Sequence, residues 1–146
     1  GQSPGGRRFG ELVHEVLAVV PLDADGETVQ RHATLRARIL GEEGLVDEAC
    51  RAVEAALAHP VFAAARTAER AVRELPLAHR RPDNTVMEGV ADLVLFHDEG
   101  ITVVDYKTDR DPGEERRRTY EQQVRLYADA LAEATGREVR AVLLSV

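Results

Sequence analysis

One lysine and a nearby aspartate are the residues whose types and spacing most strongly indicate chemistry in this sequence. Lys107 is the single lysine among 19 basic residues, and the other 18 are arginines. It follows Asp105 by two positions in a segment typical of a β-strand, so both side chains are expected on one face of that strand. A lysine kept where arginine is used everywhere else indicates a need for a compact ammonium rather than a planar guanidinium.

A tight turn after His97 is expected to bring a second aspartate to this face. A two-residue loop directly after His97 pairs positions whose numbers sum to 197, which sets Asp92 opposite Asp105. A loop one residue later gives a sum of 199, and Asp92 then faces Lys107. Both registers cluster two carboxylates and an amine on one face, whereas a three-residue loop would separate them.

Such a cluster is suited to phosphodiester hydrolysis. Neighbouring carboxylates repel, and burying them costs on the order of several kcal/mol unless a cation compensates. Mg²⁺ prefers one or two carboxylates together with waters and phosphate oxygens. An adjacent ammonium can hold or deprotonate the attacking water and offset the charge of a phosphorane-like transition state. The pattern therefore predicts a Mg²⁺-dependent phosphodiesterase, with Mn²⁺ as a substitute ion.

The elements that position this cluster change their hydrophobic period halfway along the chain. Helical spacing predicts helices at 7–20, about 27–40 and about 45–58, and a short helical turn from Pro60 to Arg66. The second half predicts strands at 69–79, 86–96, 101–106 and 139–146, and a helix from an Asp111 N-cap and Pro112 to Thr135, ended by Gly136. This order predicts a mixed α/β layer whose last strand is parallel to a neighbour.

Composition limits the class of protein. The 146 residues, 44% hydrophobic and 31% charged, are enough for a single globular domain. No apolar run suits a membrane span or a signal sequence. A single cysteine excludes a disulfide framework, a four-cysteine zinc site and an iron–sulfur cluster, so we expect a mature cytoplasmic protein. The net charge of −7 argues against an autonomous nonspecific DNA binder but allows a divalent metal site.

Five short blocks resemble the core of the PD-(D/E)XK nucleases and, more narrowly, the nuclease domain of RecB/AddA-type helicase–nucleases, the exodeoxyribonuclease V family. The blocks are Gly10-Glu-Leu-Val-His14, Glu74-Leu-Pro, Gly89-Val-Ala-Asp92-Leu-Val, Val103-Val-Asp105-Tyr106-Lys107-Thr108 and Gln123-Val-Arg-Leu-Tyr127. They occur in the family's order on the expected elements, from about residue 7 to 146. Ala91 replaces the proline of the generic motif, which the RecB branch commonly lacks.

The resemblance implies a restriction-endonuclease-like α/β fold with a mixed central sheet flanked by helices. An N-terminal helical part of about residues 1–66 would precede a catalytic sheet core of residues 67–146 in one nuclease domain. The domain would belong to a larger helicase–nuclease of double-strand break repair and recombination. Its partners would be DNA and helicase motor domains, in the same or a partner chain, and no membrane.

The resemblance also implies roles for individual residues. Asp92, Asp105 and the backbone carbonyl of Tyr106 would bind the metal, and His14 on the first helix would add an imidazole ligand. Lys107 would be the catalytic lysine.

Three further residues would belong to the site on the same grounds. Glu74 would be a supporting acid or a ligand of a second metal. Gln123 and Tyr127 are four residues apart, hence on one helix face, and would border the site and contact DNA.

Two other functions remain open. The fold could serve as an inactive module for DNA binding or scaffolding, although degeneration normally removes an aspartate or the lysine, and all are present. A stand-alone exonuclease of the Cas4 type has similar motifs but carries a cysteine cluster, whereas this chain has only Cys50.

Each residue also has a simpler interpretation. Asp105 and Lys107 could form an exposed ion pair worth at most ~1 kcal/mol. His14 could lie at the edge of a core, and Glu74 could be a solvated strand residue. Gln123 and Tyr127 could form a half-buried helix face.

A run of three arginines, residues 116–118, is expected to pair with glutamates of its own helix, namely Glu114, Glu115 and Glu121. Contact with the DNA backbone is the alternative for this run.

Overall fold

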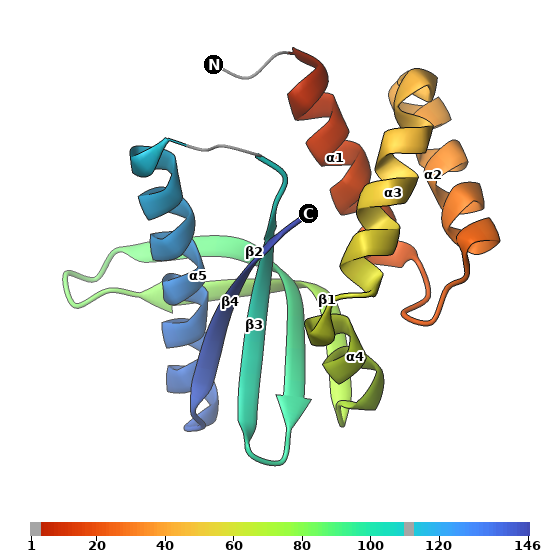
Figure 1. The fold of residues 1–146 in the computed structure, drawn as a ribbon. Coiled ribbons are helices and arrows are strands. Elements are labelled where there is room, and N and C mark those ends of the chain that lie inside the picture. The colour runs from red at the N-terminus through yellow and green to blue at the C-terminus, as the bar shows by residue number, and fades with distance from the viewer. Residues whose placement is uncertain (1–3, 110–112) are drawn as a thin grey trace. The chain divides into compact units, whose positions relative to one another are not determined.

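The structure, a computed structural model, describes residues 4–109 and 113–146. It divides into two compact units, one of residues 1–67 with 145–146 and one of residues 68–144. The described part of the first unit is helical, and that of the second is a sheet with one long helix (Figure 1).

The first unit consists of α1 (Pro4–Val19), α2 (Gly26–Leu40), the 3₁₀ turn η1 (Glu43–Leu45), α3 (Val46–Leu57) and α4 (Pro60–Thr67). α1, α2 and α3 pack against one another. Asp25 caps α2 by accepting a hydrogen bond from the backbone N–H of Thr28 at 2.8 Å, and this bond lowers the pKa of its carboxyl group. The predicted helices are confirmed within three residues at each end.

The second unit contains a four-stranded sheet of β1 (Arg70–Arg80), β2 (Val86–His97), β3 (Gly100–Lys107) and β4 (Val139–Ser145). The strands lie in the order β1-β2-β3-β4, and β1–β2 and β2–β3 are antiparallel (Figure 1). The N–H of Ile101 donates to the carbonyl of Glu138 at 2.9 Å, so β3 and β4 begin at the same end of the sheet. The two strands run in the same direction in Figure 1, which makes the sheet mixed, as predicted.

The register of the β2–β3 hairpin is the first of the two predicted alternatives. His97 pairs with Gly100 and Leu93 pairs with Val104, so paired numbers sum to 197. The same alignment continued along both strands sets Asp92 opposite Asp105.

The long helix α5 (Glu114–Thr135) packs against β1, β2 and β3. Its buried residues form one hydrophobic cluster with the sheet: Ala91, Val94, Ile101, Val103, Val124, Tyr127, Ala128 and Leu131. The helix begins at Glu114 after Gly113, two residues later than predicted, and Gly113 makes no side-chain cap. The predicted cap Asp111 and Pro112 lie outside the described residues. No helix in the described ranges has both the length and the apolarity to cross a bilayer.

Gly136 ends α5 as predicted, in the left-handed conformation (φ 69°), with its N–H bonded to the carbonyl of Ala132 at 2.8 Å. We expect Gly136→Ala to lower the free energy of unfolding by about 1 kcal/mol, because an added Cβ strains this backbone. Nothing lies within 4 Å of that Cβ, so packing adds no cost. Urea unfolding followed by circular dichroism measures the change. Gly44→Ala is the control, because that site has equal space without a positive φ; equal effects of both substitutions would contradict this account.

Candidate active site

Two carboxylates join β2 and β3 where their backbone pairing ends. Beyond Leu93 and Val104, Oδ2 of Asp92 accepts a hydrogen bond from the backbone N–H of Tyr106 at 2.7 Å. In return, Oδ1 of Asp105 accepts one from the backbone N–H of Asp92 at 3.3 Å. Each aspartate therefore fixes the opposite strand, and the two side chains come from opposite positions on neighbouring strands.

The two aspartate side chains of this pair have little contact with solvent. Asp105 is only 8% exposed, and Asp92 is half-buried. Burial raises the pKa of the Tyr127 hydroxyl, and the charges of Asp105 and Asp92 raise it further. Burial and the same two charges also raise the pKa of Tyr106. Because like charges with little water repel, this site favours a bound cation.

Lys107 is the last residue of β3 and is half-buried. Strand alternation puts it on the same face as Asp105, two positions earlier. Three of the predicted residues thus come from two neighbouring strands, Asp92 from the middle of β2 and Asp105 and Lys107 from the last three positions of β3.

Glu74 lies at the same level of the sheet, on the third strand. It occupies the β1 position opposite Asp92 and is exposed. Its φ of 54° is left-handed, which costs a non-glycine residue about 1–2 kcal/mol. At this level Ala91 and Val94 both enter the α5 core cluster, which strict alternation would forbid. The alternation of side chains along β2 is therefore interrupted between Ala91 and Val94. The charge of Glu74 also helps raise the pKa of Tyr106.

Gln123 and Tyr127 form a hydrogen-bonded pair on α5. The side-chain amide of Gln123 donates to the Tyr127 hydroxyl at 2.7 Å, and Tyr127 is 3% exposed. Tyr127 fits over β2 because residue 89 is glycine: a Cβ there would lie 2.7 Å from Cε1 of Tyr127. Burial raises the pKa of Tyr127, and the charges of Asp105 and Asp92 add to this rise.

His14 lies in the middle of α1, half-buried, with Nδ1 3.0 Å from the carbonyl oxygen of Gly10. This bond favours the tautomer that carries the proton on Nδ1 and leaves Nε2 as an acceptor, as a metal-ligating histidine requires. His14 belongs to the first unit, so its predicted place beside the aspartates stays a prediction.

The donor set at the strand ends fits Mg²⁺ rather than a metal bound wholly by side chains. Within residues 4–109 and 113–146, no group of three or more histidine, cysteine or acidic residues is placed to hold an ion. Mg²⁺ keeps several waters and needs only one or two carboxylates. Asp92 and Asp105 supply these, next to the backbone of Tyr106.

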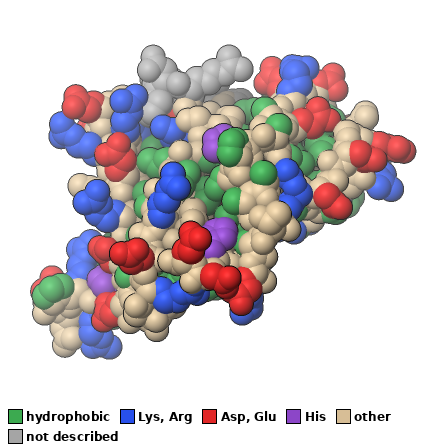
Figure 2. All heavy atoms as spheres, turned by 60° about the horizontal axis from the view of Figure 1, so that its bottom comes forward, with side chains coloured by type: hydrophobic (Ala, Val, Ile, Leu, Met, Phe, Trp, Pro, Cys, Tyr) green, Lys and Arg blue, Asp and Glu red, His purple; other side chains and the backbone are tan. Residues whose placement is uncertain are grey.

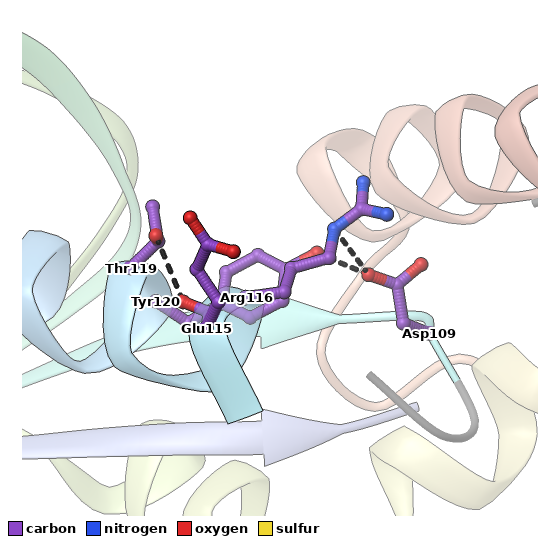
Figure 3. Close-up of polar contacts among 5 residues, drawn as sticks. All are labelled: Asp109, Glu115, Arg116, Thr119 and Tyr120. Atoms are coloured by element: carbon purple, nitrogen blue, oxygen red, sulfur yellow. Dashed lines mark hydrogen bonds and ion pairs between the residues drawn. The ribbon is translucent and has the colours of Figure 1, made fainter. Parts of the chain in front are cut away.

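A polar cluster that the sequence did not reveal joins the segment after Lys107 to α5. Asp109 accepts a hydrogen bond from the Tyr120 hydroxyl at 2.5 Å and pairs with Arg116 at 3.1 Å (Figure 3). The expected pairing of the arginine run within its own helix holds for Arg118, which contacts Glu114 at 3.0 Å, and is wrong for Arg116. The available signal was the spacing of Arg116 and Tyr120, which are four residues apart on one helix face.

Residues 2–146 match the PD-(D/E)XK nuclease superfamily, and the chain belongs to this superfamily. The mixed four-stranded sheet flanked by helices is consistent with its restriction-endonuclease-like fold, so the predicted fold class is confirmed.

Three curated relatives are each named as one subunit of an ATP-dependent helicase/nuclease, the AddA type. The one from Anoxybacillus flavithermus is 32% identical over 143 residues, which cover 89% of this chain and 12% of the relative. The one from Carboxydothermus hydrogenoformans is 39% identical over 61 residues, or 40% of this chain and 5% of the relative. The one from Streptococcus equi subsp. zooepidemicus is 36% identical over 74 residues, or 47% and 6%. The chain thus spans about an eighth or less of the relatives it matches.

The fit between Gly89 and Tyr127 gives a test of this packing. We expect Gly89→Ala to lower the free energy of unfolding by about 1–3 kcal/mol, because the new methyl group overlaps the tyrosine ring. In a Tyr127→Leu background the cost should fall by at least half, because leucine does not reach position 89. Urea unfolding of the four proteins in this double-mutant cycle measures the coupling. Additive costs would show that the two residues do not share this contact, and Gly113→Ala, which adds a methyl group in open space, is the control.

Proposed function

We propose that this chain is the nuclease domain of a larger helicase–nuclease of double-strand break repair and recombination, and that it hydrolyses DNA with Mg²⁺. The opposed pair Asp92 and Asp105, two residues before Lys107 on β3, carries the proposal. Membership of the PD-(D/E)XK nuclease superfamily supports it, as do the relatives' names.

Four groups would hold the metal. Asp92 and Asp105 would provide carboxylate oxygens, Tyr106 its backbone carbonyl, and His14 its Nε2 atom. When bound, Mg²⁺ polarises the phosphoryl oxygen and acidifies water. The hydrogen bonds between Asp92, Tyr106 and Asp105 keep the two carboxylates in place before the ion arrives, so binding requires little rearrangement.

Lys107 acts on the water and on the phosphate. Its Nζ atom holds the attacking water on the face that Asp105 shares. The water oxygen forms the new bond to phosphorus while the bond to the leaving sugar oxygen breaks. The ammonium offsets the negative charge that builds on the phosphate oxygens.

Gln123, Tyr127 and Glu74 support this centre from its borders. The Gln123–Tyr127 pair, with Tyr127 packed over Gly89 of β2, would border the aspartates and contact the DNA strand. Glu74 is exposed on β1, opposite Asp92, where it would act as a supporting acid or a ligand of a second metal.

The charge distribution supports a module that receives its DNA from a motor. The chain carries a net charge of −7. On the face drawn in Figure 2, acidic and basic side chains are interspersed over the described residues. Since nonspecific DNA binding depends on phosphate neutralisation, helicase motor domains would supply most of the affinity for DNA.

We expect Asp105→Asn and Lys107→Ala each to lower the DNA cleavage rate by at least about 100-fold, because each removes a group that acts on the reacting phosphate. Lys107→Arg should lose nearly as much, since a guanidinium cannot replace the compact ammonium. Cleavage of end-labelled single- and double-stranded DNA, with Mg²⁺ and with a chelator, measures the loss.

Asp98→Asn, in the exposed turn of the same hairpin, is the matched control and should cleave like the unaltered protein. Wild-type rates in Asp105→Asn or Lys107→Ala, or cleavage that survives the chelator, would overturn the proposed mechanism.

Metal binding has a readout that does not depend on cleavage. We expect Mg²⁺ or Mn²⁺ to raise the melting temperature, because an ion that binds only the folded state stabilises it by about 2.7 kcal/mol at 100 times its Kd. Asp92→Asn and Asp105→Asn should abolish the shift, and Asp98→Asn should keep it. Thermal unfolding at increasing metal concentration checks this. An unchanged melting temperature would instead favour the inactive module for DNA binding or scaffolding.

A further inference from the structure

A buried carboxylate anchors the chain directly after the lysine. Asp109 lies two residues beyond Lys107, where the chain leaves the sheet, yet its side chain is only 8% exposed. Its Oδ2 atom accepts a hydrogen bond from the Tyr120 hydroxyl at 2.5 Å and lies 3.1 Å from Nε of Arg116. Figure 3 shows both α5 side chains extending toward Asp109. A buried carboxylate held by a hydroxyl and a guanidinium is a firm tether.

Arg116 and Tyr120 lie on the face of α5 that also carries Gln123 and Tyr127. Arg116, Tyr120, Gln123 and Tyr127 follow one another at steps of four, three and four residues, so they form one stripe along α5. The tether therefore fixes the segment after Lys107 to the same stripe that carries Gln123 and Tyr127.

The pairing of β3 with β2 stops short of Lys107, so of its two neighbouring strands only β4 accompanies β3 to this end. Backbone pairing between β2 and β3 ends at Leu93 and Val104, and the next fixed point is the bond from Tyr106 to Asp92. A lysine side chain has a flexible four-carbon stem, so its direction depends on how firmly its backbone is held. Asp109 supplies a fixed point on the other side.

Resting on the function proposed above, we infer that Asp109 is a positioning residue that directs Lys107 by tying the chain after it to Tyr120 and Arg116 of α5. Tyr120 is the main anchor. Its pKa is raised by burial and by the bond to Asp109, so the hydroxyl keeps the proton that it donates. Arg116 is 52% exposed, so solvent weakens its ion pair, and it contributes less.

The test compares variants of this cluster in steady-state DNA cleavage. We expect Asp109→Ala and Tyr120→Phe to lower kcat about 10- to 100-fold, because small displacements of a catalytic group have effects of this size. The KM for DNA should change less than about twofold, since no contact with substrate is removed. Asp109→Asn should keep kcat within about threefold of wild type, because its amide oxygen still accepts the Tyr120 bond. Arg116→Ala should lose less than Tyr120→Phe.

Glu114→Gln is the control, because it breaks the exposed Arg118–Glu114 pair on the same helix and should change neither kcat nor KM. Amide hydrogen exchange provides a second measurement. In Asp109→Ala, exchange should increase at Lys107 and Thr108 and stay unchanged in the hairpin turn at 97–100.

Two results would overturn the inference: a wild-type kcat in a folded Asp109→Ala protein, or unchanged exchange at Lys107 and Thr108. An equal loss of kcat in Asp109→Asn and Asp109→Ala would also overturn it, because charge and not anchoring would then be at work. If the unaltered protein and Glu114→Gln both fail to cleave DNA, the proposed function is wrong, and exchange still decides whether Asp109 holds the segment.

Discussion

The site depends on the repulsion between two aspartates that the β2–β3 hairpin forces into opposition. Asp92 and Asp105 would separate if their strands were free, and the fold prevents this by giving each carboxylate a backbone N–H from the facing strand. These bonds replace the ordinary backbone ladder beyond Leu93 and Val104. The negative potential that results would favour a bound cation, on which the proposed phosphate chemistry depends.

Much of this arrangement follows from local sequence signals. The alternation of apolar residues and the short turn after His97 predict the hairpin, and they narrow its register to two choices, of which the structure has the first. Glycine at position 136 predicts where α5 ends, because its left-handed backbone suits glycine. The isolated Lys107 pointed to the site because one unusual residue in an arginine-rich chain demands a chemical reason.

Features that depend on contacts between distant residues were not predictable in the same way. The alternation of residues in β1 does not predict the left-handed backbone of Glu74. This residue lies beside the point in β2 where the side-chain alternation is interrupted. The contacts of Asp109 with Arg116 and Tyr120 could be predicted only from the way α5 packs on the sheet. Helix spacing alone predicts that Arg116 pairs with glutamates of its own helix. The predicted place of His14 beside the aspartates rests on the family resemblance and not on any local pattern, and it stays a prediction.

Residues of α5 and of its C-terminal flank hold β3 near both of its ends. Just beyond the C-terminal end of α5, the Arg137 guanidinium donates to the carbonyl of His97 and, at 3.5 Å, to that of Gly100, while the Asp109 cluster binds the first turns of the helix. A strand anchored near both ends resists fraying, so local opening of this unit should begin elsewhere. The exposed loop at 81–85, which joins β1 to β2, is where we expect such opening to begin. Local opening at this loop would then leave the arrangement of Asp92, Asp105 and Lys107 unchanged.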